Sequence, residues 1–109
     1  MSFVTIAQVS ELTDDLPLAV DVDDELVVAI VRHDGELFAI EDVCSHGNVP
    51  LSEGDVEDGA VECYLHGSRF DLATGKALNL PATQPVRVFP IRTQGDDIQI
   101  DVSVTATDF

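Results

Sequence analysis

The sequence predicts a single all-β domain built from short antiparallel strands. Three observations carry this prediction: β-branched runs, turn signals about every ten residues, and almost no helical periodicity. The chain has 109 residues, of which 45% are hydrophobic. That length supports one modest hydrophobic core, so we expect one domain over residues 1–109.

The first two expected elements are a strand and a short helical turn. Residues 3–9, FVTIAQV, are β-branched and roughly alternating, which is typical of a strand. Residues 10–16, SELTDDL, carry the clearest helical signal, with Ser10 as the expected N-cap. Pro17 would end this turn because proline interrupts the helical hydrogen bonds.

Three strand pairs are expected after this turn. Residues 26–41, LVVAIVRHDGELFAIE, form the clearest hairpin because Asp34-Gly35 tolerates positive φ in a tight turn. The two other expected pairs are 59–65 with 68–78, the latter turning at Thr74-Gly75, and 85–93 with 96–104, joined around Gln94-Gly95.

The net charge of the chain limits the classes of partner that it is expected to bind. It carries 21 acidic and 5 basic residues, a formal net charge of −16. That field repels nucleic acid and anionic membranes, and it favours a protein partner with a basic face. The alternative is that the acids only keep the protein in solution. No apolar run is long enough to span a membrane and no basic, then apolar, leader is visible, so a cytoplasmic location is expected.

Both cysteines have a histidine close by in the sequence. Cys44-x-His46 and Cys63-x-x-His66 use the only two cysteines and two of the three histidines. Thiolate and imidazole are ligands of soft and borderline metals, and the chain looks cytosolic, where a disulfide is disfavoured. The sequence therefore predicts a metal site made of Cys44, His46, Cys63 and His66.

The spacing of these ligands favours a cluster over a single zinc ion. Zinc knuckles usually place their paired ligands two to four residues apart, often pairing like with like. Here each loop offers one cysteine and one histidine, which suits a [2Fe–2S] cluster with two cysteines on one iron and two histidines on the other. A zinc-stabilised binding module remains the alternative.

The surrounding motifs resemble those of a known family. Sixteen residues separate His46 from Cys63, and RFD at 69–71, TGK at 74–76 and LPA at 80–82 follow. Together with the ligand pattern, these resemble the small soluble Rieske ferredoxins of bacterial aromatic-ring oxygenase systems, over nearly the whole chain. The resemblance implies stacked antiparallel sheets, with a cluster-binding subdomain over about 42–82 at the tip and a base formed by the flanking strands.

The resemblance also assigns supporting residues around the cluster. Gly47 and Gly67 would let the backbone turn close to it, although ordinary turn glycines are the alternative. Pro81 resembles a rigid third loop that shields the cluster, and a plain strand-ending proline is the alternative. The Ser68 hydroxyl would donate to a bridging sulfide, whereas Phe70 stands where higher-potential relatives have a tyrosine. The acidic surroundings also oppose reduction, so we expect a reduction potential toward the low end, about −150 mV, of the Rieske range.

Three further observations qualify this interpretation. Respiratory Rieske proteins tie their cluster loops with a disulfide, but Asn48 and Leu65 leave no cysteine for one, which favours the soluble branch. Tyr64 is expected to pack as an ordinary aromatic. His33, beside a hairpin turn, is expected to be a surface histidine.

The function implied by the resemblance is one-electron transfer from a flavin-dependent reductase to a terminal oxygenase. The chain is not expected to be an enzyme itself, because it lacks a mononuclear iron triad and any flavin or nucleotide fingerprint. Asp55, Glu57 and Asp58, between the ligand loops, are candidate docking residues. The alternatives are the small Rieske subunit of a nitrite-reductase-type enzyme and an accessory Rieske protein of iron–sulfur cluster assembly.

Overall fold

The computed structural model describes residues 3–23, 26–44, 49–65, 67–80 and 84–103. Nine strands are present within these residues, grouped into three antiparallel sheets of three strands each. The strands are β1 (Val4–Gln8), β2 (Leu18–Asp21), β3 (Val27–His33), β4 (Glu36–Glu41), β5 (Asp55–Glu57), β6 (Ala60–Glu62), β7 (Arg69–Asp71), β8 (Ile91–Gln94) and β9 (Asp97–Ile100). Two 3₁₀ turns accompany them, η1 (Val9–Glu11) and η2 (Leu51–Glu53). The all-β prediction is confirmed.

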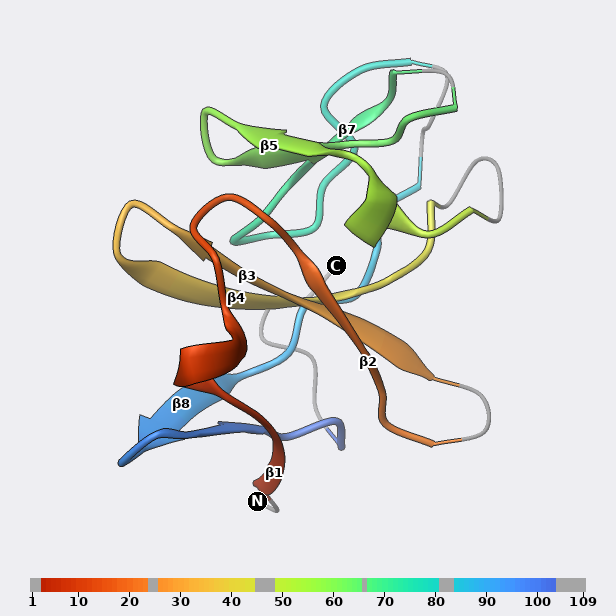
Figure 1. Ribbon diagram of the computed structural model, residues 1–109. Coiled ribbons are helices and arrows are strands. Elements are labelled where there is room, and N and C mark those ends of the chain that lie inside the picture. The colour runs from red at the N-terminus through yellow and green to blue at the C-terminus, as the bar shows by residue number, and fades with distance from the viewer. Residues whose placement is uncertain (1–2, 24–25, 45–48, 66, 81–83, 104–109) are drawn as a thin grey trace.

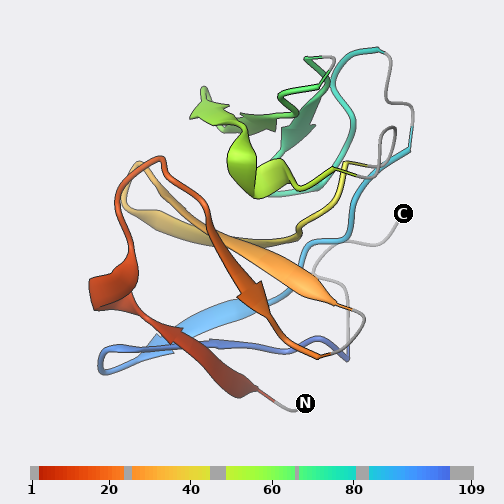
Figure 2. The same ribbon diagram turned by 45° about the vertical axis from the view of Figure 1, so that its right-hand side comes forward.

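The three sheets are stacked as layers (Figures 1 and 2). The outer layers are the β1-β9-β8 sheet at one end and the β5-β6-β7 sheet at the other, with the β2-β3-β4 sheet between them. The first and last strands thus meet in one layer, because β1 pairs with β9. The β5-β6-β7 layer follows the central sheet in the chain and is the one that carries the segments next to the ligand loops.

The hairpin of the central sheet forms as the sequence predicts. β3 and β4 pair in register from Val28 with Glu41 to His33 with Glu36. The two residues between them, Asp34 and Gly35, have φ of 52° and 79°. Two successive positive φ values match the twist of the flanking strands, which is why this dipeptide closes the hairpin tightly.

The central sheet separates two hydrophobic cores. Successive side chains of a strand point to opposite faces, so Ile30 packs in one core and Val31 in the other. On β4, Ala39 and Ile40 divide in the same way. This explains why β3 reads as a continuous apolar run, since both of its faces are covered. The core beneath the β5-β6-β7 sheet contains both cysteines, Cys44 and Cys63.

Some local details differ from the sequence predictions. β2 and β5 were not expected. The predicted helical turn at 10–16 is instead the shorter η1, and Ser10 is not its N-cap: that place belongs to Gln8, whose backbone N–H donates to the Glu11 carboxylate at 2.9 Å. The Ser10 hydroxyl donates to Asp96 at 3.0 Å, a contact from another strand pair that local spacing does not reveal. Among the described residues, no helix is long and apolar enough to cross a membrane.

Candidate metal centre

The two predicted cysteine ligands lie in the same buried cluster of side chains. Cys44 and Cys63 are free thiols, with relative exposures of 2% and 1%. Leu51, Phe70 and Leu72 belong to the same cluster and are almost completely buried. Any metal site that both thiols form would therefore be attached to the protein interior through them. Four further predicted residues of the site, His46, Gly47, His66 and Pro81, lie outside the described residues.

Cys44 stands at the start of a loop that is closed at its base. Its backbone N–H donates to the carbonyl of Val49 at 2.8 Å. One step further out, the carboxylate of Asp42 accepts from the Ser52 backbone N–H at 2.6 Å and from the Ser52 hydroxyl at 2.7 Å. Asp42 is only 8% exposed, so these bonds satisfy a nearly buried charge. Sequence reasoning missed this pair, although an acid two residues before the first cysteine was a visible signal.

Cys63 opens a tight loop directly after β6. Its N–H donates to the Ser68 carbonyl at 2.7 Å, and its own carbonyl accepts from the Gly67 N–H at 3.0 Å. Gly67 has φ of +76°, a conformation that favours glycine and lets the chain reverse here. Ser68, predicted to serve the cluster, is completely buried beside this turn.

A third segment, residues 78–80, is attached to the second ligand loop. The Leu78 N–H donates to the Arg69 carbonyl at 2.8 Å. The side-chain amide of Asn79 then accepts from the Arg69 N–H at 2.6 Å and donates to the Gly67 carbonyl at 3.1 Å. Sequence reasoning missed this role as well, because an asparagine in a loop is ordinarily read as a turn residue.

Apolar side chains are exposed on these same loops. Tyr64 is 53% exposed, Leu65 45%, Leu78 51% and Leu80 74%. Tyr64 is expected from the sequence to pack as an ordinary aromatic, but about half of it is exposed in the structure. Several large hydrophobic residues exposed on neighbouring loops are typical of a surface that meets another protein.

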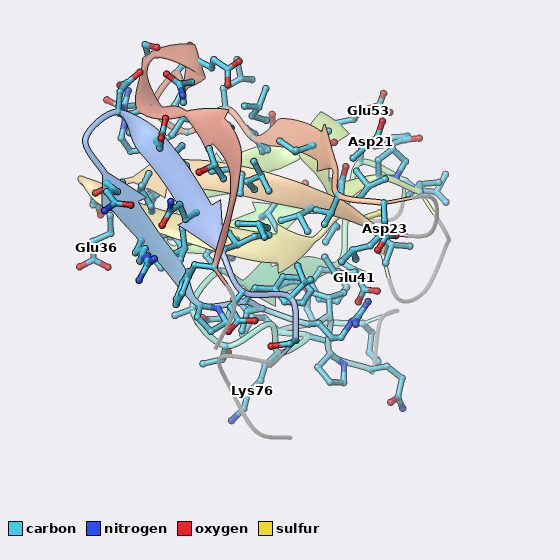
Figure 3. The ribbon with its side chains drawn as sticks, turned by 90° about the horizontal axis from the view of Figure 1, so that it is seen from below. Asp21, Asp23, Glu36, Glu41, Glu53 and Lys76 are labelled. Atoms are coloured by element: carbon cyan, nitrogen blue, oxygen red, sulfur yellow. The ribbon has the colours of Figure 1, made fainter. Side chains whose placement is uncertain are left out.

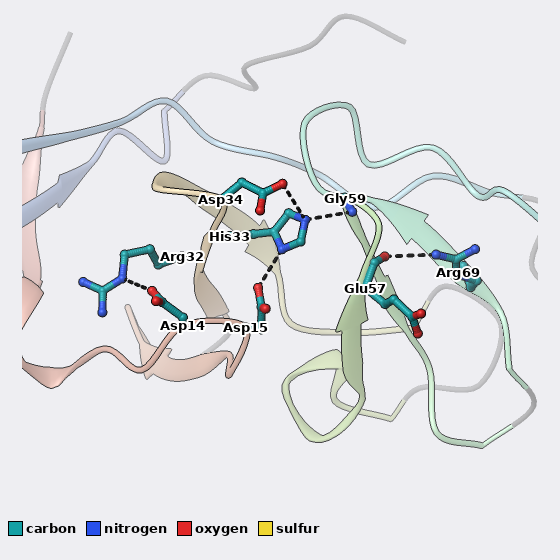
Figure 4. Close-up of polar contacts among 8 residues, drawn as sticks. All are labelled: Asp14, Asp15, Arg32, His33, Asp34, Glu57, Gly59 and Arg69. Carbon is teal, nitrogen blue, oxygen red and sulfur yellow. Dashed lines mark hydrogen bonds and ion pairs between the residues drawn. The ribbon is translucent and has the colours of Figure 1, made fainter.

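The acid-rich span between the ligand loops is an ordered hairpin. β5 and β6 pair through the turn at Asp58-Gly59, and the carboxylates of Asp55, Glu57, Asp58 and Glu62 line a pocket together with Arg69. The Arg69 guanidinium donates to the Glu57 backbone carbonyl at 3.0 Å (Figure 4). Carboxylates are not confined to this hairpin: Glu36 and Glu53 project outward from opposite sides of the molecule (Figure 3).

His33 is better buried than the sequence suggested. Its side chain is 14% exposed, because it is enclosed between Asp15 on one side and the Asp58-Gly59 turn on the other (Figure 4). The hydrogen bond from its Nδ1 to Asp15 raises the pKa of His33, and the nearby carboxylates of Asp34 and Asp58 act in the same direction against partial desolvation. His33 therefore lies at the edge of the surface, partly buried and hydrogen-bonded, and not as a freely exposed histidine.

Comparisons with known proteins agree with this geometry. A family model described as "Rieske [2Fe-2S] domain" matches residues 2–90. The chain is 51% identical over 85 residues to the 3-phenylpropionate/cinnamic acid dioxygenase ferredoxin subunit of Escherichia coli, and the match covers 77% of this chain and 80% of that protein.

Solved structures show the same fold at the same size. The Sphingomonas yanoikuyae B1 ferredoxin superposes with a TM-score of 0.86 at 32% identity, covering 92% of this chain and 98% of that one. A chain from a complex of reduced oxygenase and oxidized ferredoxin in carbazole 1,9a-dioxygenase gives a TM-score of 0.83 at 26% identity, covering 90% and 91%. A putative nitrite reductase small subunit gives 0.81, covering 94% and 100%, but at 19% identity this likeness concerns the fold alone.

Proposed function

Because this chain belongs to the Rieske [2Fe–2S] domain family, we propose that it is the ferredoxin component of an aromatic-ring dioxygenase system. The observation that carries this proposal is the 51% identity to a dioxygenase ferredoxin subunit of which the match covers 80%. A match of that extent includes most of a protein that is named as a ferredoxin subunit. The chain is therefore an electron carrier, and the catalytic chemistry belongs to another subunit.

The residues of the chain fit the cofactor of this family. Two free thiols, Cys44 and Cys63, are buried in one cluster, which suits the iron that lies toward the protein. We assign His46 and His66 to the outer iron, and the one-cysteine, one-histidine composition of each loop supports this assignment. When bound, the [2Fe–2S] cluster takes up and releases one electron at a potential that histidine ligation raises above that of an all-cysteine cluster.

The chain's own residues would control the surroundings of this site. Leu51, Phe70 and Leu72 exclude water from the cysteine side, which lowers the local dielectric constant. The Cys44–Val49 and Cys63–Ser68 backbone hydrogen bonds fix the backbone at the base of each ligand loop. A site held in this way needs little rearrangement when its charge changes.

The surface near the ligand loops offers both apolar and acidic contacts to partners. Tyr64, Leu65, Leu78 and Leu80 supply the apolar area, and the β5–β6 hairpin supplies carboxylates. We assign the apolar area to the docking of the terminal oxygenase, and the oxygenase–ferredoxin complex of a structural relative supports such a pairing. We assign the carboxylates to the docking of a flavin-dependent reductase with a basic face, because complementary charge speeds such encounters. We propose that these encounters take place in the cytoplasm.

Reconstitution tests this function. The purified chain, a flavin-dependent ferredoxin reductase and an aromatic-ring dioxygenase with its NADH supply are combined, and oxidised aromatic product is measured. Product formation should depend on the chain and should be lost with Cys63→Ser, which removes a ligand. Turnover that is equally fast without the chain, or a purified protein that contains zinc and no iron, would contradict the proposal.

A further inference from the structure

Asn79 directly follows a segment whose backbone pairs with β7, and it continues the contacts with its side chain. Residues 76–78 run beside β7. The last backbone hydrogen bond of this pairing is donated by the Leu78 N–H to the Arg69 carbonyl at 2.8 Å. One residue later, the side-chain amide of Asn79 makes the next contacts with the same chain segment. The pairing is therefore extended toward the second ligand loop by a side chain.

The two hydrogen bonds of Asn79 bracket Ser68. Its Oδ1 accepts from the N–H of Arg69 at 2.6 Å, and its Nδ2 donates to the carbonyl of Gly67 at 3.1 Å. The orientation of the amide is fixed chemically, since a backbone N–H can only donate and a carbonyl can only accept. The pairing of residues 76–78 with β7 is antiparallel. In a regular antiparallel pair the Arg69 N–H would donate to the Leu78 carbonyl, because the Leu78 N–H already donates to the Arg69 carbonyl. The Asn79 Oδ1 takes the place of that backbone acceptor.

The bracketed residue is in turn bonded to a proposed cluster ligand. The Ser68 carbonyl accepts from the Cys63 N–H at 2.7 Å, and the Gly67 N–H donates to the Cys63 carbonyl at 3.0 Å. Ser68 and Cys63 are buried, with exposures of 0% and 1%, whereas Asn79 is exposed. A continuous series of hydrogen bonds therefore leads from a surface side chain to the backbone of Cys63.

We propose that Asn79 is a positioning residue that holds Ser68 and the Cys63 loop in place beside the cluster, and so raises its reduction potential and slows its loss. This inference rests on the function and ligand set proposed above. Hydrogen bonds from hydroxyl and N–H groups toward cluster sulfur favour the reduced, more negative state, and such outer partners tune metal sites. The effect of these hydrogen bonds depends on holding their donors at a fixed distance from the sulfur. The Asn79 amide would do this through its two hydrogen bonds to the backbone on either side of Ser68.

The first test compares Asn79→Ala with Leu80→Ala in the cluster-loaded protein. Leu80 is the neighbouring residue, 74% exposed, so its truncation controls for a change to the same loop. In Asn79→Ala, the Arg69 amide should exchange with deuterium about tenfold faster, because it loses its acceptor. The equilibrium constant for reduction should fall by up to about tenfold, which for a one-electron couple is 59 mV. Iron should be lost to a chelator about tenfold faster.

A second pair of variants separates the two hydrogen bonds. Asn79→Asp keeps an acceptor for the Arg69 N–H but loses the donor to the Gly67 carbonyl. Leu80→Asp adds the same charge one residue away and leaves the Asn79 amide intact. We expect normal protection of the Arg69 amide in Asn79→Asp, together with a reduction potential below that of Leu80→Asp.

Two results would overturn the inference. One is an unchanged exchange rate of the Arg69 amide in Asn79→Ala, which would mean that the hydrogen bond does not constrain the loop. The other is equal reduction potentials in Asn79→Ala and Leu80→Ala. With a normal iron–sulfur spectrum in the wild type, either result would contradict this inference alone. A wild-type protein without that spectrum would contradict the proposed function as well.

Discussion

The Nε2 atom of His33 lies 3.0 Å from the backbone nitrogen of Gly59, and it accepts the N–H of that residue (Figure 4). His33 ends β3 in the central sheet, whereas Gly59 lies in the turn between β5 and β6. The His33 imidazole therefore connects the central β2-β3-β4 sheet to the β5-β6-β7 sheet, which contains the acid-rich hairpin. Because Nε2 accepts in this arrangement, the neutral ring carries its proton on Nδ1 and donates it to Asp15 at 2.6 Å.

Replacing His33 by alanine should make stability less dependent on pH. The hydrogen bond to Asp15 raises the pKa of His33 above 6.5 in the folded protein. Protonation at Nε2 gives up the bond from the Gly59 N–H but strengthens the interactions with the Asp15 and Asp34 carboxylates, and the raised pKa means that the balance favours the protonated ring. This stability is fully present below about pH 6.5 and is lost as pH rises through the folded pKa. The free energy of urea unfolding of the wild type should therefore exceed that of His33→Ala most at about pH 5.5, and less at about pH 8.

The control for this prediction is Asp15→Asn, which removes the main cause of the raised pKa. In that background, the loss of stability caused by His33→Ala should change much less with pH. In the wild-type background, a stability difference that grows as the pH rises over the same range would contradict the assignment of Asp15 as the dominant partner.

Asp42 should stabilise the base of the first ligand loop. Its carboxylate accepts two hydrogen bonds from Ser52 and is almost buried. Asp42→Ala leaves the Ser52 N–H without this acceptor, which should lower the free energy of unfolding by about 1–3 kcal/mol. Ser52→Ala removes only the hydroxyl and should cost about 1 kcal/mol or less. Urea denaturation of both variants measures this, and equal costs would show that the backbone N–H bond contributes nothing.

Two glycines next to the strands of the β5–β6 hairpin should respond differently to alanine. A Cβ on Gly54 would lie 1.7 Å from the Glu62 carbonyl oxygen, so the backbone would have to move, at a cost of about 3 kcal/mol. At Gly59 nothing lies within 4 Å, and only its φ of +77° opposes alanine, at about 1 kcal/mol. In thermal unfolding, the Tm of Gly54→Ala should be well below the Tm of Gly59→Ala. The reverse order would mean that the close approach at Gly54 does not exist in solution.

Neutralising the hairpin acids should slow reduction of the protein by its reductase. The triple variant Asp55→Asn, Glu57→Gln, Asp58→Asn should lower the second-order rate by about tenfold at low salt, and high salt should reduce this difference. The matched control, Asp21→Asn, Glu36→Gln, Asp96→Asn, changes the net charge equally at other sites. Stopped-flow kinetics measure both. Equal rates for the two variants would assign the effect to overall charge and contradict docking on the hairpin.

Several elements of the fold could be predicted because their signals are local. Asp34-Gly35 between two apolar runs specifies a tight hairpin, and the structure has it there. The strand pair closed at Gly95 was predictable for the same reason. β2 and β5 have only four and three residues, too few to show an alternating pattern, so pairing with their neighbours, more than their own pattern, makes them strands. The Asp58-Gly59 turn was nevertheless available as a signal for β5.

The candidate site was predictable in its ligands but not in its supports. Cys44 and Cys63 stand out because cysteine is rare in this chain and each has a histidine nearby. The contacts of Asn79 and His33 join residues that are brought together only by folding, such as His33 and Gly59. A pairwise contact across two sheets leaves no periodic trace in the sequence, so the sequence alone predicts His33 as a surface residue.

The central claim is that Cys44, His46, Cys63 and His66 hold a cluster with mixed ligands. Redox titration of the purified protein, followed by electron paramagnetic resonance, tests it most directly. We predict a red-brown protein with one reducible [2Fe–2S] centre, an average g below the free-electron value, and a midpoint near the low end of the Rieske range, about −150 mV. A midpoint near the value of all-cysteine plant-type clusters, about −400 mV, would contradict the histidine ligands.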